Sequence, residues 1–251
     1  MNIPPLLTLF LLAHVIADFY LQPHNMAKKK NKKCLYLIGH AFIYTACIAL
    51  VPSILICLDV MAYSPYILWM FLLLSISHLV IDYLKRFVGK LKIKREFTYD
   101  QLTHIAFITL AWCLWGKNLS VSHILNETAH VFLIALGLLI LMRPIGIFIE
   151  RGDIWDFDKA SDNSKEEAQA QKHENTSRLI GYLERIIIYI LLLSGQYTAI
   201  AFVIATKTIA RYPEINNEEK HLKASYYIIG TLLSVTSVFV VTILLGLAGI
   251  G

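Results

Sequence analysis

The sequence predicts an all-α protein, a polytopic bundle of about seven transmembrane helices. Hydrophobic residues occupy 57% of the 251 positions and charged residues only 16%, a balance typical of chains that lie mostly in lipid. Several apolar runs also reach the roughly 20 residues that a helix needs to cross a bilayer. They cover approximately residues 3–22, 34–58, 66–84, 99–115, 128–149, 180–209 and 226–250.

The loops between these runs predict the orientation of the chain. The first and third loops are basic, whereas residues 59–65 and 116–128 carry only Lys117 as a fixed positive charge. The basic residues are Lys28, Lys29, Lys30, Lys32 and Lys33, then Lys85, Arg86, Lys90, Lys92, Lys94 and Arg95. By the positive-inside rule these loops face the cytoplasm, which puts the N-terminus outside. The rule also explains the net charge of +5, so we expect membrane lipids as partners and no nucleic acid.

The first run carries polar residues that are costly to bury in lipid. Its sequence HVIADFYLQ contains His14, Asp18 and Gln22 at four-residue spacing, so all three share one helix face. The run lacks the basic start and small-residue cleavage site of a signal peptide, so we expect it to remain in the protein. Ionisable groups inside a membrane indicate a functional site by default.

The same polar pattern returns later in the chain. His78 and Asp82 repeat the four-residue spacing of the first run, at an offset of 64 residues. His40 follows His14 by 26 residues, and His104 follows His78 by the same 26. We interpret residues 3–58 and 66–115 as a duplicated helical hairpin, with chance identity as the alternative.

The fourth run contains Asp100 and His104 in the reverse order. This run leads away from the cytoplasm, so its aspartate must come first to reach the depth of the other two. At a rise of 1.5 Å per residue, the four histidines fall roughly 9 to 12 Å inside the cytoplasmic edge, and the three aspartates roughly 3 to 6 Å. The sequence therefore predicts one layer of imidazoles and one layer of carboxylates.

Histidine and aspartate without a thiolate are ligands suited to zinc, manganese or iron. We predict a divalent metal ion, zinc in the first place, with ligands drawn from His14, Asp18, His40, His78, Asp82 and His104. One ion would take three or four of them and leave the others to orient the imidazoles, or two ions would share an aspartate. Gln22, Lys85 and Gln101 are predicted to support the site by hydrogen bonding, although Lys85 could also simply pair with Asp82. Asp100 has no counterpart in the first repeat and is the candidate general base.

The predicted organisation has three parts. Residues 1–149 form the membrane bundle with the site and a fifth helix, residues 150–178 a polar cytoplasmic linker, and residues 179–251 the C-terminal membrane helices. The run 180–209 is interrupted near Gly195, so a single crossing and a re-entrant path both stay open. The four cysteines show no pairing pattern, and we expect them to be small buried core residues.

The motifs HVIADFYLQ, IGHAF, SHLVID and DQLTH, followed by IGYLER, GQYTAIAFVIATKTIAR and YYIIGTLLS, resemble a family catalogued as a domain of unknown function. The resemblance extends over nearly the whole chain and is most specific in the N-terminal polar motifs. It implies a multi-pass protein of the bacterial inner membrane, and it implies no reaction.

These observations favour an intramembrane metal-dependent hydrolase that opens to the cytoplasmic leaflet and acts on a lipid or membrane-anchored substrate. A transporter for a divalent metal or for protons is an alternative, although the first runs show no matching polar track towards the outer face. A bis-histidine haem protein is another, which the adjacent carboxylates disfavour. A membrane protein with a structural metal site also remains open.

Overall fold

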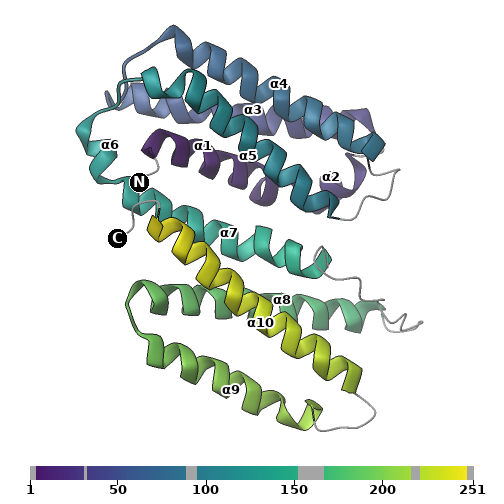
Figure 1. The fold of residues 1–251 in the computed structure, drawn as a ribbon. Coiled ribbons are helices and arrows are strands. Elements are labelled where there is room, and N and C mark those ends of the chain that lie inside the picture. The colour runs from purple at the N-terminus through teal and green to yellow at the C-terminus, as the bar shows by residue number, and fades with distance from the viewer. Residues whose placement is uncertain (1–3, 31–32, 89–94, 152–166, 216–220, 248–251) are drawn as a thin grey trace. The chain divides into compact units, whose positions relative to one another are not determined.

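A computed structural model describes residues 4–30, 33–88, 95–151, 167–215 and 221–247. These residues form helices and no named strand (Figure 1), so the predicted all-α class is confirmed for this part of the chain. Four helices are long and apolar enough to span a membrane: Cys34–Cys57, Pro65–Arg86, Ala129–Glu150 and Ile228–Leu245. Two apolar helices, Pro5–Tyr20 and Tyr197–Ile209, are shorter. The protein is therefore membrane-spanning in character, and the count of seven helices and the duplicated hairpin stay predictions.

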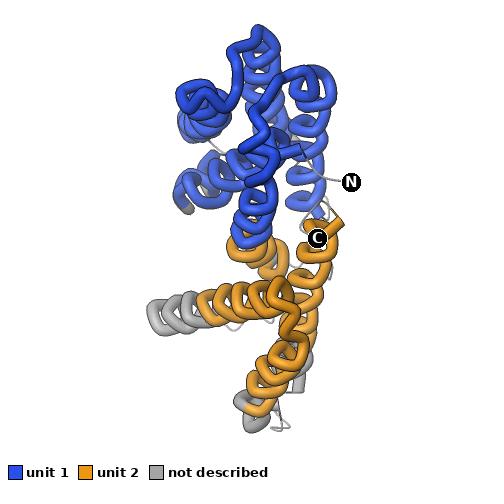
Figure 2. Tube along the Cα trace, turned by 90° about the vertical axis from the view of Figure 1, so that its left-hand side faces the viewer, with its two compact units in different colours: residues 1–139, 248–251 blue, residues 140–247 orange. Residues whose placement is uncertain are grey.

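The chain divides into two compact units (Figure 2), residues 1–139 with 248–251 and residues 140–247. The helices of unit 1 are α1 (Pro5–Val15), η1 (Ile16–Tyr20), α2 (His24–Lys29), α3 (Cys34–Cys57), α4 (Pro65–Val88), α5 (Glu96–Leu114), η3 (Gly116–Asn118), α6 (His123–Glu127) and the start of α7 (Ala129–Arg151). The first helix, α1, packs against α3 and α5, and α4 packs against both α3 and α5. Four helices thus surround one interior.

Proline marks the starts of several of these helices. Pro5 is the first residue of α1, Pro23 directly precedes α2, and Pro65 begins α4. Proline suits this position because its fixed φ angle matches the helix and its missing N–H would have no partner there. Pro23 therefore separates the first apolar helix, Pro5–Tyr20, from the short helix α2 that follows it.

The interior of unit 1 is apolar towards one end and polar towards the other. Phe10, Ile48, Leu74 and Ile108 are buried in a single hydrophobic cluster. Large apolar side chains also cover the outer surface of the helices, as expected where they face lipid. The prediction that the cysteines are buried core residues is wrong, because Cys34, Cys57 and Cys113 are exposed and Cys47 is partly exposed. A small polarisable side chain is equally compatible with a lipid-facing surface.

Unit 2 holds the end of α7 together with α8 (Glu167–Leu193), α9 (Tyr197–Ile215) and α10 (His221–Leu245). The predicted run 180–209 is two helices, which are separated at Gly195 by a backbone with φ of +69°. These two helices pack against each other and against α10. The run is therefore not one continuous helix. Of the predicted linker 150–178, residues 152–166 lie outside the described residues, and residues from Glu167 onward belong to α8.

Buried polar contacts connect the helices of unit 2. Arg185 of α8 donates from Nε to the main-chain oxygen of Leu141 (2.6 Å), from Nη2 to that of Met142 (3.2 Å) and from Nη1 to the hydroxyl of Ser234 (3.3 Å). Lys207 of α9 pairs with Glu184 of α8. Arg185 is only 4% exposed, so its donors join α7, α8 and α10.

Candidate metal centre

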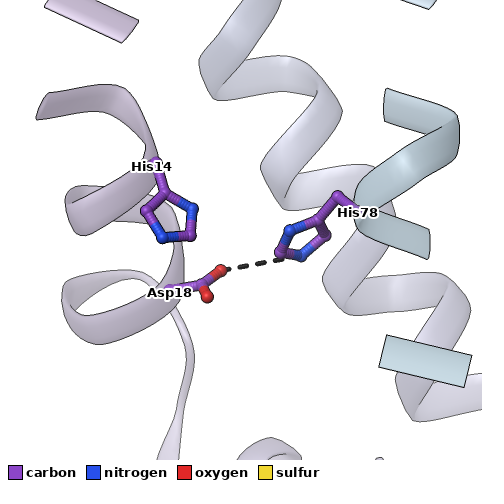
Figure 3. A group of neighbouring side chains, drawn as sticks. All are labelled: His14, Asp18 and His78. Carbon is purple, nitrogen blue, oxygen red and sulfur yellow. Dashed lines mark ion pairs between the residues drawn. The ribbon is translucent and has the colours of Figure 1, made fainter. Parts of the chain in front are cut away.

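The first helix changes its winding where it reaches the polar interior. Regular α-helix ends at Val15, and Ile16–Tyr20 forms a wider π turn, in which the N–H of Leu21 donates to the main-chain oxygen of Ile16 (2.9 Å). Single π turns occur frequently at functional sites. This turn contains Asp18, and Figure 3 shows its carboxylate directed at the ring of His78 on another helix, with His14 one turn away. The turn therefore presents Asp18 to the interior of the bundle.

Three potential ligand atoms of the site come together from η1, α3 and α4. The Nε2 atoms of His40 and His78 are 3.1 Å apart. Oδ1 of Asp18 lies 3.3 Å from Nε2 of His40 and 3.6 Å from Nε2 of His78. The side chains of His40 and His78 are no more than 1% exposed, and that of Asp18 is 7% exposed. Three potential ligand atoms thus converge at one buried point.

Asp82 stands beside this trio and is paired with a lysine. Its Oδ2 atom lies 3.4 Å from Nε2 of His40 and 3.7 Å from Nε2 of His78. Nζ of Lys30 donates to both carboxylate oxygens, at 3.0 Å to Oδ1 and 2.8 Å to Oδ2. Lys30 immediately follows α2 and is only 8% exposed. This lysine is therefore part of the site.

The fifth helix supplies the other side of the cluster. Nζ of Lys85 donates to Oδ2 of Asp100 at 2.5 Å, and the ring of His104 stacks on that of His14 with centroids 5.3 Å apart. Nε2 of His14 is 3.3 Å from Oε1 of Gln101. The suggestion that Lys85 pairs with Asp82 is wrong, because Lys30 takes that carboxylate and Lys85 takes Asp100.

Neighbouring acceptors fix which ring nitrogens carry protons. Nδ1 of His104 lies 2.8 Å from the main-chain oxygen of Asp100, and a carbonyl oxygen can only accept, so Nδ1 carries the hydrogen. The amide of Gln22, oriented to satisfy its neighbours, accepts from Nδ1 of His40 and from Nζ of Lys30 at 3.2 Å each, and donates to the main-chain oxygen of Asp18. Neutral His40 and His104 therefore both present a lone pair at Nε2. Ligating histidines in metal sites are held in the same way.

Five buried polar atoms of the site lack a hydrogen-bond partner among the residues that the structure describes. They are His14 Nδ1, Asp18 Oδ1, His78 Nδ1, Asp100 Oδ1 and His104 Nε2. Buried polar atoms are nearly always paired, because leaving one unpaired costs free energy. The two carboxylate oxygens, Nδ1 of His14 and Nε2 of His104 can accept from a cation or a water, and Nδ1 of His78 can donate to a water when its Nε2 atom is a ligand.

The donor atoms fit a divalent ion. A tetrahedral zinc ion with ligand distances of 2.0 to 2.1 Å requires ligand atoms about 3.3 Å from one another, and the trio of Asp18, His40 and His78 shows 3.1 to 3.6 Å. Three overlapping groups have their ligand atoms within 4.8 Å of one another: His14, Asp18 and His78; His40, His78 and Asp82; and Asp82, Asp100 and His104. The cluster can therefore hold a metal ion.

The structure brings every predicted site residue into one cluster. This holds for the six predicted ligands, for Asp100 and for the supporting residues Gln22, Lys85 and Gln101. Their individual roles stay predictions. Two members were missed: Lys30, and Tyr44, whose ring lies parallel to that of His78 at 3.6 Å. The four-residue spacing of Tyr44 from His40 could have revealed it, whereas nothing in the sequence separates Lys30 from the neighbouring lysines.

Comparison with known proteins gives one match. The model of a family described as "Protein of unknown function (DUF3307)" matches residues 6–133. No curated protein and no solved structure gives a significant match. The resemblance expected over nearly the whole chain is thus found for the N-terminal half, which contains all the residues of the site.

Proposed function

This chain belongs to the DUF3307 family, whose function is unknown, and we propose that it is an intramembrane metal-dependent hydrolase. The convergence of Asp18, His40 and His78 carries the proposal, because Oδ1 and the two Nε2 atoms lie 3.1 to 3.6 Å apart. Two imidazoles and one carboxylate form a ligand set of catalytic zinc sites, in which the fourth position is left to water or substrate. Zinc is the proposed ion, with manganese or iron as substitutes.

The surrounding residues have separate proposed tasks. When bound, a divalent ion would polarise the scissile group of the substrate and acidify a water molecule. Gln22 holds His40 in the ligating tautomer, and Asp82 stands next to the trio as a fourth ligand or an orienting acceptor. Asp100 is the proposed general base, because Lys85 occupies its Oδ2 atom and Oδ1 is left to accept a proton.

A location near the cytoplasmic face of the bacterial inner membrane suits a lipid or membrane-anchored substrate. The proposal rests on the basic residues of the segments 28–33 and 85–86, which lie close in sequence to the site. The buried ion pairs of Lys30 and Lys85 also speak against a cation transporter. The ammonium groups next to Asp82 and Asp100 would repel a cation moving along the cluster.

Metal content is the direct test of the proposal. Full-length protein purified in detergent should contain about one zinc ion per chain by elemental analysis, as expected for a single tetrahedral site. We expect Asp18→Asn and His78→Ala to lose the ion. His130→Ala is the matched control, because His130 is exposed and lies outside the cluster, and it should keep the ion. A wild-type protein without stoichiometric metal would refute the metal-site function.

Two further measurements separate hydrolysis from its alternatives. Asp100→Asn should retain zinc and lose hydrolytic activity, whereas a purely structural metal site would show no activity to lose. Uptake of zinc into proteoliposomes by the wild-type protein would instead establish transport. An absorption spectrum with a Soret band would identify haem.

A further inference from the structure

Two buried ammonium groups reach the candidate metal centre from different elements. Lys30 comes from the end of α2, and Lys85 comes from α4. Their side chains are only 10% and 12% exposed. Lysine is rarely buried to this extent unless its charge is used. Hydrolysis of an uncharged ester by a single metal ion requires no such pair of cations.

The net charge of the site indicates the charge of the ligand that it would bind. Asp18, Asp82 and Asp100 contribute three negative charges, and Lys30 and Lys85 contribute two positive ones, so the cluster carries one net negative charge with neutral imidazoles. A divalent ion changes this to one net positive charge. An uncompensated charge is unfavourable in a low-dielectric interior. The loaded site therefore favours a ligand that brings a negative charge.

The position of Lys30 is fixed by the surrounding structure. Arg86 donates from Nε and Nη2 to the main-chain oxygen of Lys30, at 3.1 Å and 2.7 Å, and from Nη2 to that of Lys33 at 3.1 Å. The amide oxygen of Gln22 accepts from Nζ of Lys30. The ammonium group is thus held in the cluster by contacts at both ends of the residue, unlike the exposed Lys29 and Lys33.

From these contacts we infer that the site binds the phosphate group of a phosphate-bearing amphiphile, and that Lys85 is the cation that contacts it. Among the described residues Nζ of Lys85 donates to Asp100 alone. The three donors of Lys30 are instead used by Asp82 and Gln22, so Lys30 contributes its charge. The inference rests on the proposed metal-dependent function and names its substrate class. Lysine binds phosphate as a compact charge with three donors. Lipid phosphates lie at the level of the basic residues that border membrane helices, which is where the segment 28–33 follows the first helix.

The test compares three probes on zinc-loaded, full-length protein in detergent: dihexanoylphosphatidic acid, dihexanoylglycerol and inorganic phosphate. We expect phosphatidic acid to bind at least about tenfold more tightly than the glycerol lipid, as one charge-assisted hydrogen bond would give. Lys85→Gln should abolish this preference, and Lys30→Gln, which removes a positive charge from the site, should reduce it. Lys33→Gln is the matched control, since Lys33 is exposed and belongs to the same segment, and it should keep the preference.

The outcomes distinguish the source of the phosphate and the two proposals. Tight binding of phosphatidic acid with weak binding of inorganic phosphate supports a lipid, and equal binding of both supports a soluble phosphate compound. Equal binding of phosphatidic acid and dihexanoylglycerol overturns the inference, as does an equal loss in the Lys33 variant. If Lys85→Gln or Lys30→Gln does not fold, the inference is tested with Lys30→Arg and with the comparison of the two lipids on the wild-type protein. Stoichiometric zinc without a phosphate preference refutes this inference alone, whereas a phosphate preference without zinc refutes the metal-dependent function.

Discussion

The Nε2 atoms of His40 and His78 face each other at 3.1 Å inside the bundle. Gln22 accepts from Nδ1 of His40, so Nδ1 carries the hydrogen and the Nε2 atom of neutral His40 carries a lone pair. This approach is stable when Nε2 of His78 carries a hydrogen and donates it to Nε2 of His40, or when a cation lies between two lone pairs. Asp18 adds a third acceptor 3.3 Å from the same atom. The three atoms therefore mark the point that a bound cation would occupy.

Gln22 is predicted to control zinc affinity through His40. Gln22→Ala removes the acceptor for Nδ1 of His40, so the ring is no longer held in the ligating tautomer. We expect zinc affinity to fall by roughly 10- to 100-fold, measured by competition with a chelator. Gln101→Ala is the control, because Gln101 contacts His14, and it should change the affinity far less. Equal losses in the two variants would contradict the role of the tautomer.

The contact between Lys30 and Asp82 predicts a strong energetic coupling. Lys30→Met leaves a buried carboxylate without its partner and should reduce the free energy of unfolding by about 3 to 5 kcal/mol. Adding Asp82→Asn to this variant should recover a large part of the loss, which a double-mutant cycle measures. Lys33→Met, at an exposed position, should stay within about 0.5 kcal/mol of the wild type. Additive effects of the two substitutions at 30 and 82 would show that the pair is not coupled.

Asp100 is predicted to act on the reaction and not on metal binding. Asp100→Asn keeps the size of the side chain and removes the base, so we expect a rate reduction of about 10² to 10⁴ with zinc content unchanged. The rate can be followed with a fluorogenic phosphate ester in mixed micelles. Loss of zinc together with activity would instead make Asp100 a ligand, in line with the group that it forms with Asp82 and His104.

Arg185 is predicted to stabilise unit 2 without affecting the site. Arg185→Leu removes buried hydrogen bonds to Leu141, Met142 and Ser234 and should cost about 3 kcal/mol of the free energy of unfolding. Arg178→Leu is the control, because its ion pair with Glu150 is considerably exposed, and it should cost less than about 1 kcal/mol. Both variants should keep their zinc. A loss of zinc in Arg185→Leu would show that the site depends on unit 2.

The site residues were predictable because helical spacing carries most of the information. His14 with Asp18, and His78 with Asp82, are four residues apart, and each pair shares a helix face whatever the surrounding structure. Lys30 could not be predicted in this way. Its burial depends on the turn after Pro23 and on the contacts of its main-chain oxygen with Arg86, which are tertiary features.

The path of the chain was less predictable than the site. The run 180–209 is apolar on both sides of Gly195, and composition alone does not distinguish one long crossing from two packed helices. The φ angle of +69° at Gly195 produces two helices, because it ends α8 and allows α9 to begin. Exposure of the cysteines was mispredicted for a related reason, since lipid accepts apolar side chains that water would drive into a core.

The π turn at Ile16–Tyr20 holds one residue more than an α turn would need, and this makes the site sensitive to chain length. Deleting Ala17 would let the segment continue as ordinary helix, with its apolar character and its place in the bundle intact. The helix before and after the turn would keep nearly the same phase, because the π turn is what absorbs the additional residue. Asp18 would then lie three residues from His14 instead of four, and its carboxylate would leave its position 3.6 Å from Nε2 of His78. The additional residue therefore sets the direction of Asp18 and not the path of the first helix.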